Sequence, residues 1–237
     1  MTADMKKLDR AFLQDGGIER LIAEFPEIEI TPLEEREAAR RAVLAEFETG
    51  HDVWVFAYGS LMWNPAFHYA EEQIARLHGY HRAFCHHTQV ARGTAEYPGL
   101  MAGLDRGGSC SGLAYRIAPA DLEAETRILW NRETALPVYK VRVLKISTDQ
   151  GPRRAVTFVA NRDSEHYVGR LPVDEQVERI SRASGRLGSN AEYLFRLVDR
   201  LKELGIADRH FAQLRRHVAA KLEKGSESDS SPQKSDQ

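Results

Sequence analysis

Hydrophobic and polar positions follow two different periods along this chain, and each period predicts a type of secondary structure. The middle of the chain carries short apolar or alternating runs between Gly- and Pro-containing turns, a pattern typical of strands. The predicted strands cover residues 53–58, 80–87, 100–104, 111–116, 139–146 and 155–160. The first of them is apolar throughout, which favours a strand buried on both faces.

Segments with capping signals and helical periodicity predict helices before, between and after these strands. Thr31 and Glu34 form a capping box with Pro32 at the first helical position, and Ser189 with Glu192 forms a second box. The predicted helices cover residues 32–48, 120–132, 173–184, 190–204 and 209–222, the last capped by Asp208.

The order of these elements predicts the fold class and the domain organisation. Strands dominate the middle of the chain and helices dominate its ends, which indicates an α+β protein with a curved, mixed sheet. We expect residues 1–50 to form a helical extension and residues 51–224 to form the main domain. Residues 225–237 are polar and low in complexity, so they are expected to form a disordered tail.

Composition resembles that of an ordinary globular protein and narrows the expected partners. The chain has 237 residues, 42% of them hydrophobic and 29% charged, with a formal net charge of −2. A nearly neutral chain has no strong field for nucleic acid, so no nucleic-acid partner is expected. No apolar run approaches the roughly 18 residues of a membrane span, and the N-terminus lacks an apolar signal-peptide core. We therefore expect a cytoplasmic protein without membrane contact, of unknown oligomeric state.

The familiar cofactor motifs are absent from the sequence. It contains neither of the common glycine-rich phosphate-binding loops, and no G-x-S-x-G nucleophile motif. Cys85, His86 and His87 are adjacent, but on a regular strand His86 and His87 would point to opposite faces. We expect neither a metal nor an organic cofactor. Cys85 and Cys110 are expected to be reduced, partly buried thiols.

A turn with candidate binding groups follows the most apolar strand, at Tyr58, Gly59, Ser60 and Leu61. Glycine allows a sharp turn and close approach of a ligand, and backbone N–H groups in such a turn can hold a carboxylate or an oxyanion. An ordinary turn, in which Ser60 forms only local hydrogen bonds, explains the same residues.

Glu133 is the candidate acid/base. At 100° per residue it falls within about 40° of Leu122 and Leu129 on the predicted helix, so it extends the apolar face. A carboxylate that points inward from an apolar face has a raised pKa, as a general acid/base needs. Alternatively, the helix ends one turn earlier and Glu133 is solvated, or Glu133 pairs with Arg132 or Arg142.

Five motifs occur in an order that resembles a known family, the ChaC-type γ-glutamylcyclotransferases. They are FAYGSLMW at 56–63, RGT at 92–94 with PG at 98–99, GLAYR at 112–116, WNRE at 130–133 and GSNAEYL at 188–194. The resemblance covers about residues 53–220 and implies a barrel-like sheet with surrounding helices. One departure is Val138, which precedes Tyr139 where many members have Gly.

The resemblance implies a lyase that converts glutathione into 5-oxoproline and Cys-Gly without a cofactor. It identifies Glu133 as the catalytic residue. The turn Tyr58–Leu61 would then hold the γ-glutamyl group, with its amides around Gly59, Ser60 and Leu61 stabilising the oxyanion. Tyr58, Tyr139 and Tyr193 would frame the site, or else they are core tyrosines with satisfied hydroxyls. Arg92 would pair with the glycine carboxylate of glutathione.

Three alternatives remain at this point. The protein could prefer other γ-glutamyl amino acids or amines, because the motifs mostly serve the γ-glutamyl half that all these substrates share. It could instead be a binding module that has lost the chemistry, although retention of Glu133 argues against this. A thiol enzyme that uses Cys85 or Cys110 is the third alternative.

Overall fold

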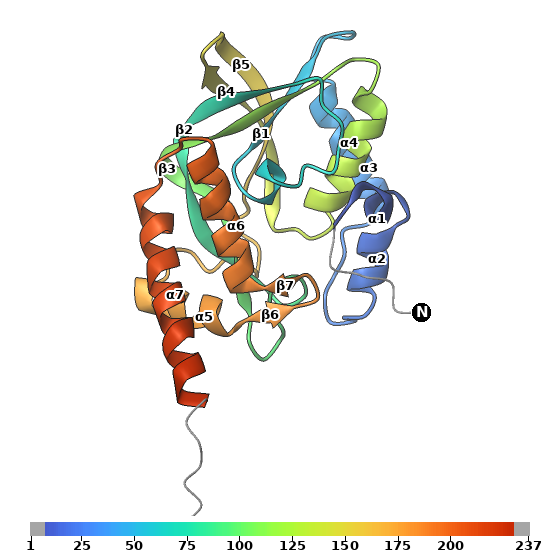
Figure 1. The fold of residues 1–237 in the computed structure, drawn as a ribbon. Helices are drawn as coiled ribbons and strands as arrows, with labels where there is room; N and C mark the ends of the chain where they lie inside the picture. Colours follow the sequence, from blue (N-terminus) through green and yellow to red (C-terminus); the bar gives the residue numbers. More distant parts are fainter. Residues whose placement is uncertain (1–7, 230–237) are drawn as a thin grey trace, which may run out of the picture.

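Strand β1 (Val53–Ala57) is the apolar run at the start of the main domain, and all five of its residues are buried. In this computed structural model, which describes residues 8–229, β1 belongs to a closed barrel with the strand order β1-β3-β2-β4-β5 (Figure 1). The other strands are β2 (Glu71–Thr88), β3 (Gly99–Ile117), β4 (Tyr139–Thr148) and β5 (Gly151–Ala160).

The barrel closes through one parallel pair of strands. β1 runs antiparallel to β3 and parallel to β5, with Trp54 opposite Ala155. The remaining pairs, β2 with β3, β2 with β4 and β4 with β5, are antiparallel. The prediction of an α+β fold with a mixed, barrel-like sheet is therefore confirmed.

The prediction of two separate strands at 100–104 and 111–116 is wrong, because both belong to β3. Gly107 and Gly108, which looked like a break, have φ of 98° and 70° and bend the strand without ending it. The partner strand has a register shift between His78 and Tyr80. The long strand β2 also begins nine residues earlier than predicted, at Glu71 instead of Tyr80.

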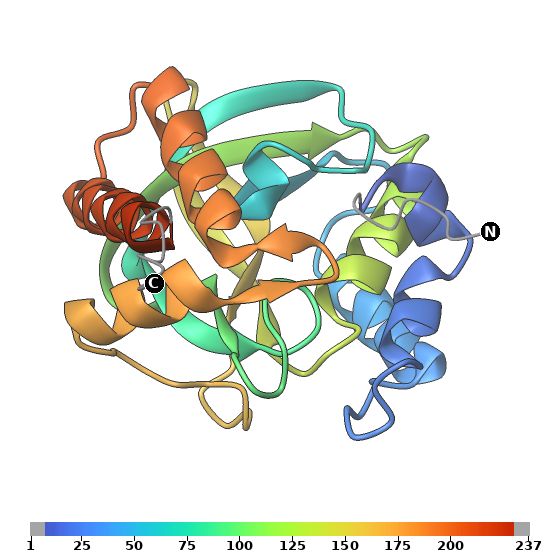
Figure 2. The ribbon, with the colours of Figure 1, turned by 60° about the horizontal axis from the view of Figure 1, so that its bottom comes forward.

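Seven helices and three short elements surround the barrel in the described part of the chain. They are α1 (Arg10–Gln14), α2 (Gly17–Ile22), α3 (Leu33–Leu44), the 3-10 turn η1 (Ser60–Met62), α4 (Leu122–Glu133), α5 (Val173–Arg182), β6 (Ser184–Gly185), β7 (Gly188–Ser189), α6 (Asn190–Glu203) and α7 (Arg209–Asp229). Figures 1 and 2 agree in placing α5, α6 and α7 on one side of the barrel and α1 to α4 on the other.

Of the three predicted N-terminal caps, two are present and one is not. The Ser189 hydroxyl accepts from the Glu192 N–H at 3.1 Å, and the Asp208 carboxylate accepts from the Phe211 N–H at 3.2 Å. At α3, Pro32 itself is the N-cap without a side-chain bond. Instead of capping this helix, Thr31 donates its N–H to Ala135 O at 2.9 Å, which ties the chain to the end of α4.

The last helix is longer than the sequence predicted. It continues to Asp229, past the end at residue 222 and into the predicted tail. Residues 230–237, the rest of that tail, lie outside the described residues.

Side chains of β1 enter two different hydrophobic clusters, as a strand buried on both faces should. Val53 and Val55 pack in the cluster that also contains residues of α4, α5, α6 and α7. Trp54 and Phe56 pack in a second cluster with residues of the other strands. A third cluster joins α1 and α2 to α4. Among residues 8–229, no helix combines the length and the apolar composition that crossing a bilayer requires.

Candidate active site

The turn after β1 presents unpaired backbone donors. η1 begins directly after Gly59, and the Gly59 and Ser60 carbonyls accept from Met62, Trp63 and Asn64. Within the described residues, the N–H groups of Gly59, Ser60 and Leu61 donate to no backbone or side-chain acceptor. Such a cluster of free amides suits an anionic group of a ligand.

A small pocket of about 10 Å³ lies at this turn, and it brings together seven of the eight predicted site residues. Those seven are Tyr58, Gly59, Ser60, Leu61, Glu133, Tyr139 and Tyr193, joined by Ala102 and Phe158. They come from the link between β1 and η1, from η1 itself, and from α4, β4 and α6, so only the folded chain assembles them. Gly59 matters for space, because a Cβ there would lie 3.4 Å from the Tyr193 hydroxyl.

The tyrosines of the pocket are neutral hydroxyl groups. Tyr58 donates to Phe158 O at 2.8 Å, and Tyr139 donates to Ala102 O at 3.2 Å. Burial raises the pKa of Tyr58 and of Tyr139 well above the usual value, and it raises the pKa of Tyr193 to about 12. These hydroxyls therefore stay protonated at neutral pH and can orient a substrate without adding charge.

Glu133 is the last residue of α4 and faces inward. Its side chain is 12% exposed, so the solvated alternative is wrong. Burial raises the pKa of the Glu133 carboxyl, while the charge and hydrogen bond of Arg132, 3.0 Å away, oppose this increase. Of the two predicted pairings, the one with Arg132 is present, and the Arg142 guanidinium donates to Val141 O instead.

Arg132 was expected only as a possible partner of Glu133, and the structure gives it further contacts in the site. Besides pairing with Glu133, it donates to the Ser60 hydroxyl at 2.8 Å and to Asn64 O. Its side chain is buried to 96% (4% exposed), and it links the end of α4 to η1. Its place beside Glu133 in the WNRE motif was the available signal.

Arg92 is absent from the small pocket. It lines a neighbouring cavity of about 260 Å³, together with Ser60, Arg132 and Tyr193. Its guanidinium pairs with the Glu192 carboxylate at 2.9 Å. The cavity thus adjoins the site, but the charge of Arg92 is already partly balanced.

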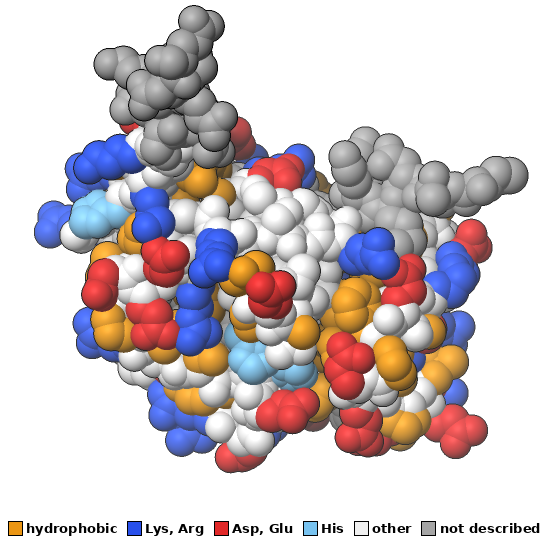
Figure 3. Space-filling view, turned by 90° about the horizontal axis from the view of Figure 1, so that it is seen from below, with side chains coloured by type: hydrophobic (Ala, Val, Ile, Leu, Met, Phe, Trp, Pro, Cys, Tyr) orange, Lys and Arg blue, Asp and Glu red, His pale blue; other side chains and the backbone are white. Residues whose placement is uncertain are grey.

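A second neighbouring cavity, of about 160 Å³, opens from the same site. It shares Ser60, Glu133 and Tyr139 with the small pocket, and Val138, which replaces the family's Gly, also lines it. Figure 3 shows a group of histidine side chains beside hydrophobic ones in the middle of the face seen from below. The histidines that line the cavity are His86, His87 and His166.

These histidines do not form a metal site. His86 and His87 both line the cavity, at a register shift of β2 between Phe84 and His86, where a regular strand would separate them. Burial lowers the pKa of His86 to about 4, and His87 Nε2 lies 3.1 Å from His166 Nδ1. Among residues 8–229, no cluster of three or more His, Cys, Asp or Glu side chains could hold a metal ion.

The two cysteines are unsuited to nucleophilic catalysis. Both Cys85 and Cys110 are buried and free. Burial raises the pKa of the Cys85 thiol to about 12 and also raises that of Cys110. A nucleophilic cysteine needs the opposite shift, so the geometry disfavours the thiol-enzyme alternative.

The chain is similar to known proteins over most of its length. Residues 53–221 match the sequence model of the ChaC-like protein family. A glutathione-specific gamma-glutamylcyclotransferase from Escherichia coli is 36% identical over 202 residues, which are 85% of this chain and 87% of that protein. The human glutathione-specific gamma-glutamylcyclotransferase 1 is 31% identical over 170 residues, 68% of this chain and 76% of that protein.

A solved structure shares the fold. The crystal structure of the yeast gamma-glutamyl cyclotransferase specific to glutathione superposes with a TM-score of 0.67 and 22% identity. The match covers 72% of this chain and 96% of the yeast chain. At this identity the likeness supports the fold alone.

Proposed function

The chain belongs to the family of ChaC-like proteins, and from this membership we propose that it is a glutathione-specific γ-glutamylcyclotransferase. The enzyme would be a lyase that converts glutathione into 5-oxoproline and Cys-Gly. The observation that carries the proposal is the pocket in which a buried carboxylate, Glu133, faces the turn Tyr58–Leu61 with its free amides.

The γ-glutamyl group would bind at the small pocket, whose tyrosine side chains would have to move outward, because its present volume of about 10 Å³ holds about one water molecule. The free N–H groups of Gly59, Ser60 and Leu61 suit an anionic oxygen, and the neutral tyrosine hydroxyls suit polar atoms of the substrate. A folded γ-glutamyl chain brings its own α-amine next to its γ-carbonyl carbon. Such intramolecular geometry gives the amine a large effective concentration at the carbon that it attacks.

Glu133 would transfer the protons. The substrate's α-ammonium group, with a pKa of about 8 in peptides, first gives a proton to the carboxylate. The free amine then attacks the γ-carbonyl carbon, and a bond forms between these two atoms. When the tetrahedral intermediate collapses, the C–N bond to cysteine breaks and Glu133 gives its proton to the departing nitrogen. The carboxylate then takes the second proton from the ring nitrogen, which leaves neutral 5-oxoproline, and passes it to the released amine, which becomes the ammonium group of Cys-Gly. The raised pKa of Glu133 suits both transfers.

Backbone amides of the turn would stabilise the negative charge that develops on the γ-carbonyl oxygen. Arg132 would position the reacting groups rather than react, because it holds Glu133 and Ser60 at once. Arg92 in the adjoining cavity remains our candidate for the glycine carboxylate, in which case Glu192 would have to share it.

The chemistry uses only the substrate's own amine and protein groups, so we propose that no metal or organic cofactor takes part. We further propose that the protein acts in the cytoplasm and that residues 51–224 form the catalytic domain, with residues 1–50 as an extension. Cyclisation of other γ-glutamyl amino acids or amines is the second candidate, because the small pocket would contact only the γ-glutamyl half that these substrates share.

A product assay tests the proposal. Purified protein is incubated with glutathione, γ-glutamyl-alanine and a γ-glutamylamine, and mass spectrometry measures 5-oxoproline and the released amine. We expect kcat/KM to be highest for glutathione. Equal or higher kcat/KM for γ-glutamyl-alanine would identify the second candidate, and no 5-oxoproline from any compound would leave a binding module without this chemistry.

A further inference from the structure

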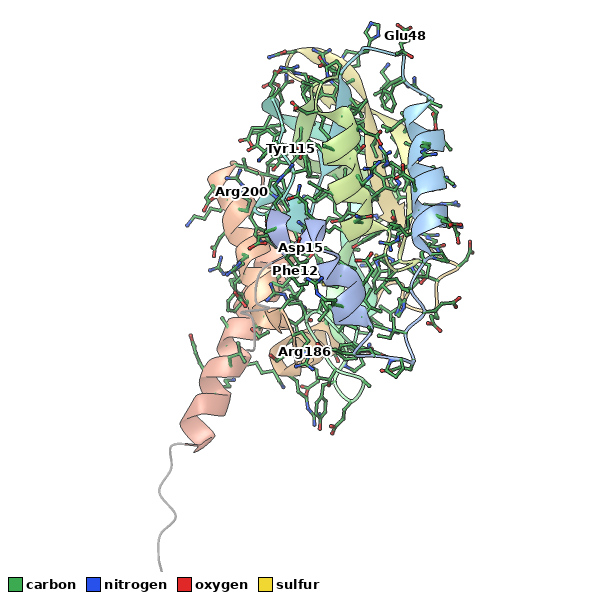
Figure 4. The ribbon with its side chains drawn as sticks, turned by 90° about the vertical axis from the view of Figure 1, so that its right-hand side faces the viewer. Phe12, Asp15, Glu48, Tyr115, Arg186 and Arg200 are labelled. Carbon is green, nitrogen blue, oxygen red and sulfur yellow. The ribbon has the colours of Figure 1, made fainter. Side chains whose placement is uncertain are left out.

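The N-terminal segment, defined here as residues 8–30, is fixed to the main domain by ion pairs. Arg10 of α1 makes two hydrogen bonds of 2.5 and 2.8 Å to Glu125 of α4, a residue that is only 3% exposed. Figure 4 shows Phe12 and Asp15 of this segment on the side of the molecule where α4 lies. Glu24 also pairs with Arg186 at 2.5 Å.

This segment supplies one wall of the cavity of about 160 Å³ that Glu133 also lines. Its wall is wholly apolar and consists of Leu8, Ile18, Leu21, Ile22 and Ile28. Ile18, Leu21 and Ile22 also pack with Val90 and Ala135 in the third hydrophobic cluster, so the wall is firmly seated. The segment lies outside residues 53–221, where the family model matches.

The position of Glu133 indicates which part of a substrate would enter this cavity. Ser60, Glu133 and Tyr139 line both the small pocket and the cavity, so they mark the boundary between the two. If the γ-glutamyl group fills the small pocket, the scissile bond lies at this boundary. The departing amine then lies on the cavity side. This cavity and the one that Arg92 lines share Ser60 and Arg132, so the glycine end of the leaving dipeptide would point from the first toward the second.

We infer that the N-terminal segment is part of the active site, where its apolar wall shapes the subsite for the leaving amine. This inference rests on the proposed function. The subsite would take a dipeptide with a short apolar or thiol side chain, because the wall offers aliphatic carbon and the cavity measures about 160 Å³. Leu21 and Ile18 would thereby limit the size of the leaving group.

Two further observations support the inference, one on a ligand in the cavity and one on the link between the segment and Glu133. His86 is 1% exposed and lines the cavity, and its Nε2 makes no hydrogen bond of regular geometry among the described residues, where the Val138 backbone is only a weak polar neighbour of the ring. A polar atom of a bound dipeptide would satisfy this nitrogen. The segment is also connected to the acid/base: Leu8 O accepts from Asn64 Nδ2 at 2.9 Å, and Asn64 O accepts from Arg132, which holds Glu133.

Filling and widening the cavity test the inference. For Leu21→Trp we expect kcat/KM for glutathione to fall at least tenfold, mainly through KM, and inhibition by Cys-Gly to weaken by a similar factor. Inhibition by 5-oxoproline, which needs only the small pocket, should stay within twofold of wild type. Leu21→Ala should raise kcat/KM for a γ-glutamyl dipeptide with a bulky first residue, relative to glutathione. Leu33→Trp is the control, because Leu33 on α3 is 58% exposed and does not line the cavity.

The outcomes distinguish failure of the subsite inference from failure of the proposed function. Circular dichroism and thermal melting first establish that a variant is folded. A folded Leu21→Trp protein with unchanged glutathione kinetics and unchanged Cys-Gly inhibition overturns the inference. Where Leu21→Trp does not fold, an unchanged ratio of bulky-substrate to glutathione kcat/KM in Leu21→Ala overturns it. A wild-type protein that yields no 5-oxoproline from glutathione rejects the proposed function itself.

Discussion

At the scale of single residues, burial and the neighbouring Arg132 have opposite effects on the pKa of Glu133. Burial favours the neutral form of the carboxyl group, and the guanidinium at 3.0 Å favours the charged form. The balance raises the pKa of Glu133, so the group can accept and return a proton more readily than an exposed glutamate. Both residues lie in the last turn of α4, and the hydrogen bond from Arg132 to the Ser60 hydroxyl fixes this helix end beside the turn.

Replacement of Glu133 by Gln should therefore abolish most turnover. Gln keeps the size of the side chain but cannot exchange a proton usefully, so kcat should fall by about 10²–10⁴-fold. Substrate affinity should change much less, because the turn Tyr58–Leu61 remains. Glu48→Gln is the control, since Glu48 lies at the far end of the molecule (Figure 4) and its side chain is 86% exposed. A Glu133→Gln enzyme that keeps at least a tenth of wild-type kcat would contradict the acid/base role.

The same variant predicts a pH dependence of stability. A carboxyl group with a raised pKa binds its proton more tightly in the folded state than in the unfolded state. Its contribution to folding is therefore fully present below the unfolded value of about 4.5 and is lost as pH rises through the raised pKa of Glu133. Because Gln never loses a proton, Glu133→Gln should unfold at a higher urea concentration than wild type at pH 8. At pH 4 this advantage should vanish, and an advantage independent of pH would show that Glu133 has no raised pKa.

At the scale of secondary-structure elements, one side chain joins α6 to the start of β3. Asn190 is fully buried, accepts from Leu100 N–H at 2.6 Å and donates to Leu100 O at 2.7 Å. It thus satisfies two backbone groups that have no access to water. The same helix carries Tyr193 into the small pocket, so this junction also places a site residue.

Asn190→Ala should lower the free energy of unfolding by about 1–3 kcal/mol for a buried group left without its partner, and more if both Leu100 groups stay unsatisfied. Urea denaturation measures the change. Asn161→Ala is the matched control, because its amide bonds Pro137 O in an exposed position and should contribute much less. Equal losses of unfolding free energy in the two variants would show that the buried position of Asn190 does not strengthen its contribution to stability.

The sequence predicted elements correctly where local signals were strong. It gave wrong boundaries where the pairing of distant strands determines the structure. The apolar run of β1, the Ser189 cap and the inward-facing Glu133 are local patterns, and all three are present. Gly107 and Gly108 were misread because a glycine pair looks the same whether it ends a strand or bends one. Only the pairing of β3 with β2 distinguishes these cases, and pairing is not local information.

Site residues follow the same division. The family resemblance led to seven of the nine residues that line the small pocket, including Tyr139 and Tyr193. They gave no indication that Arg92 faces Glu192, or that Leu21 walls a cavity beside Glu133. Such contacts depend on how distant segments pack against one another, and neither periodicity nor spacing encodes that.

At the scale of the whole molecule, the N-terminal segment depends on the main domain through a buried carboxylate. Burial acts to raise the pKa of Glu125, but hydrogen bonds from Arg10 and from the His68 N–H outweigh burial and lower it. A carboxyl group with a lowered pKa contributes stability above its unfolded value of about 4.5, and this contribution is lost as pH falls through the lowered pKa.

Arg10→Ala should therefore destabilise the protein at neutral pH, by about 1–3 kcal/mol or somewhat more for a buried charged group that loses its partner. The difference from wild type should shrink as the pH falls below about 4.5, where Glu125 becomes protonated in the variant. Urea unfolding at pH 7 and pH 4 checks both statements. Arg127→Ala removes an exposed pair with Glu123 and should cost at most about 1 kcal/mol at either pH. A loss no larger than this control would show that the Arg10 pair does not hold the segment.

The parallel closure of the barrel has a consequence for the order in which the chain can fold during synthesis. β1 leaves the ribosome first among the barrel strands, but the two strands that pair with it, β3 and β5, are made later. Trp54 cannot pair with Ala155 until β5 has been made. Until β5 has been translated, an entirely apolar strand has at least one unpaired edge, which is the kind of surface that nascent chains bury in chaperones or in aggregates. We therefore expect ribosome-bound chains that stop before residue 160 to recruit chaperones, and chains that extend beyond β5 to release them.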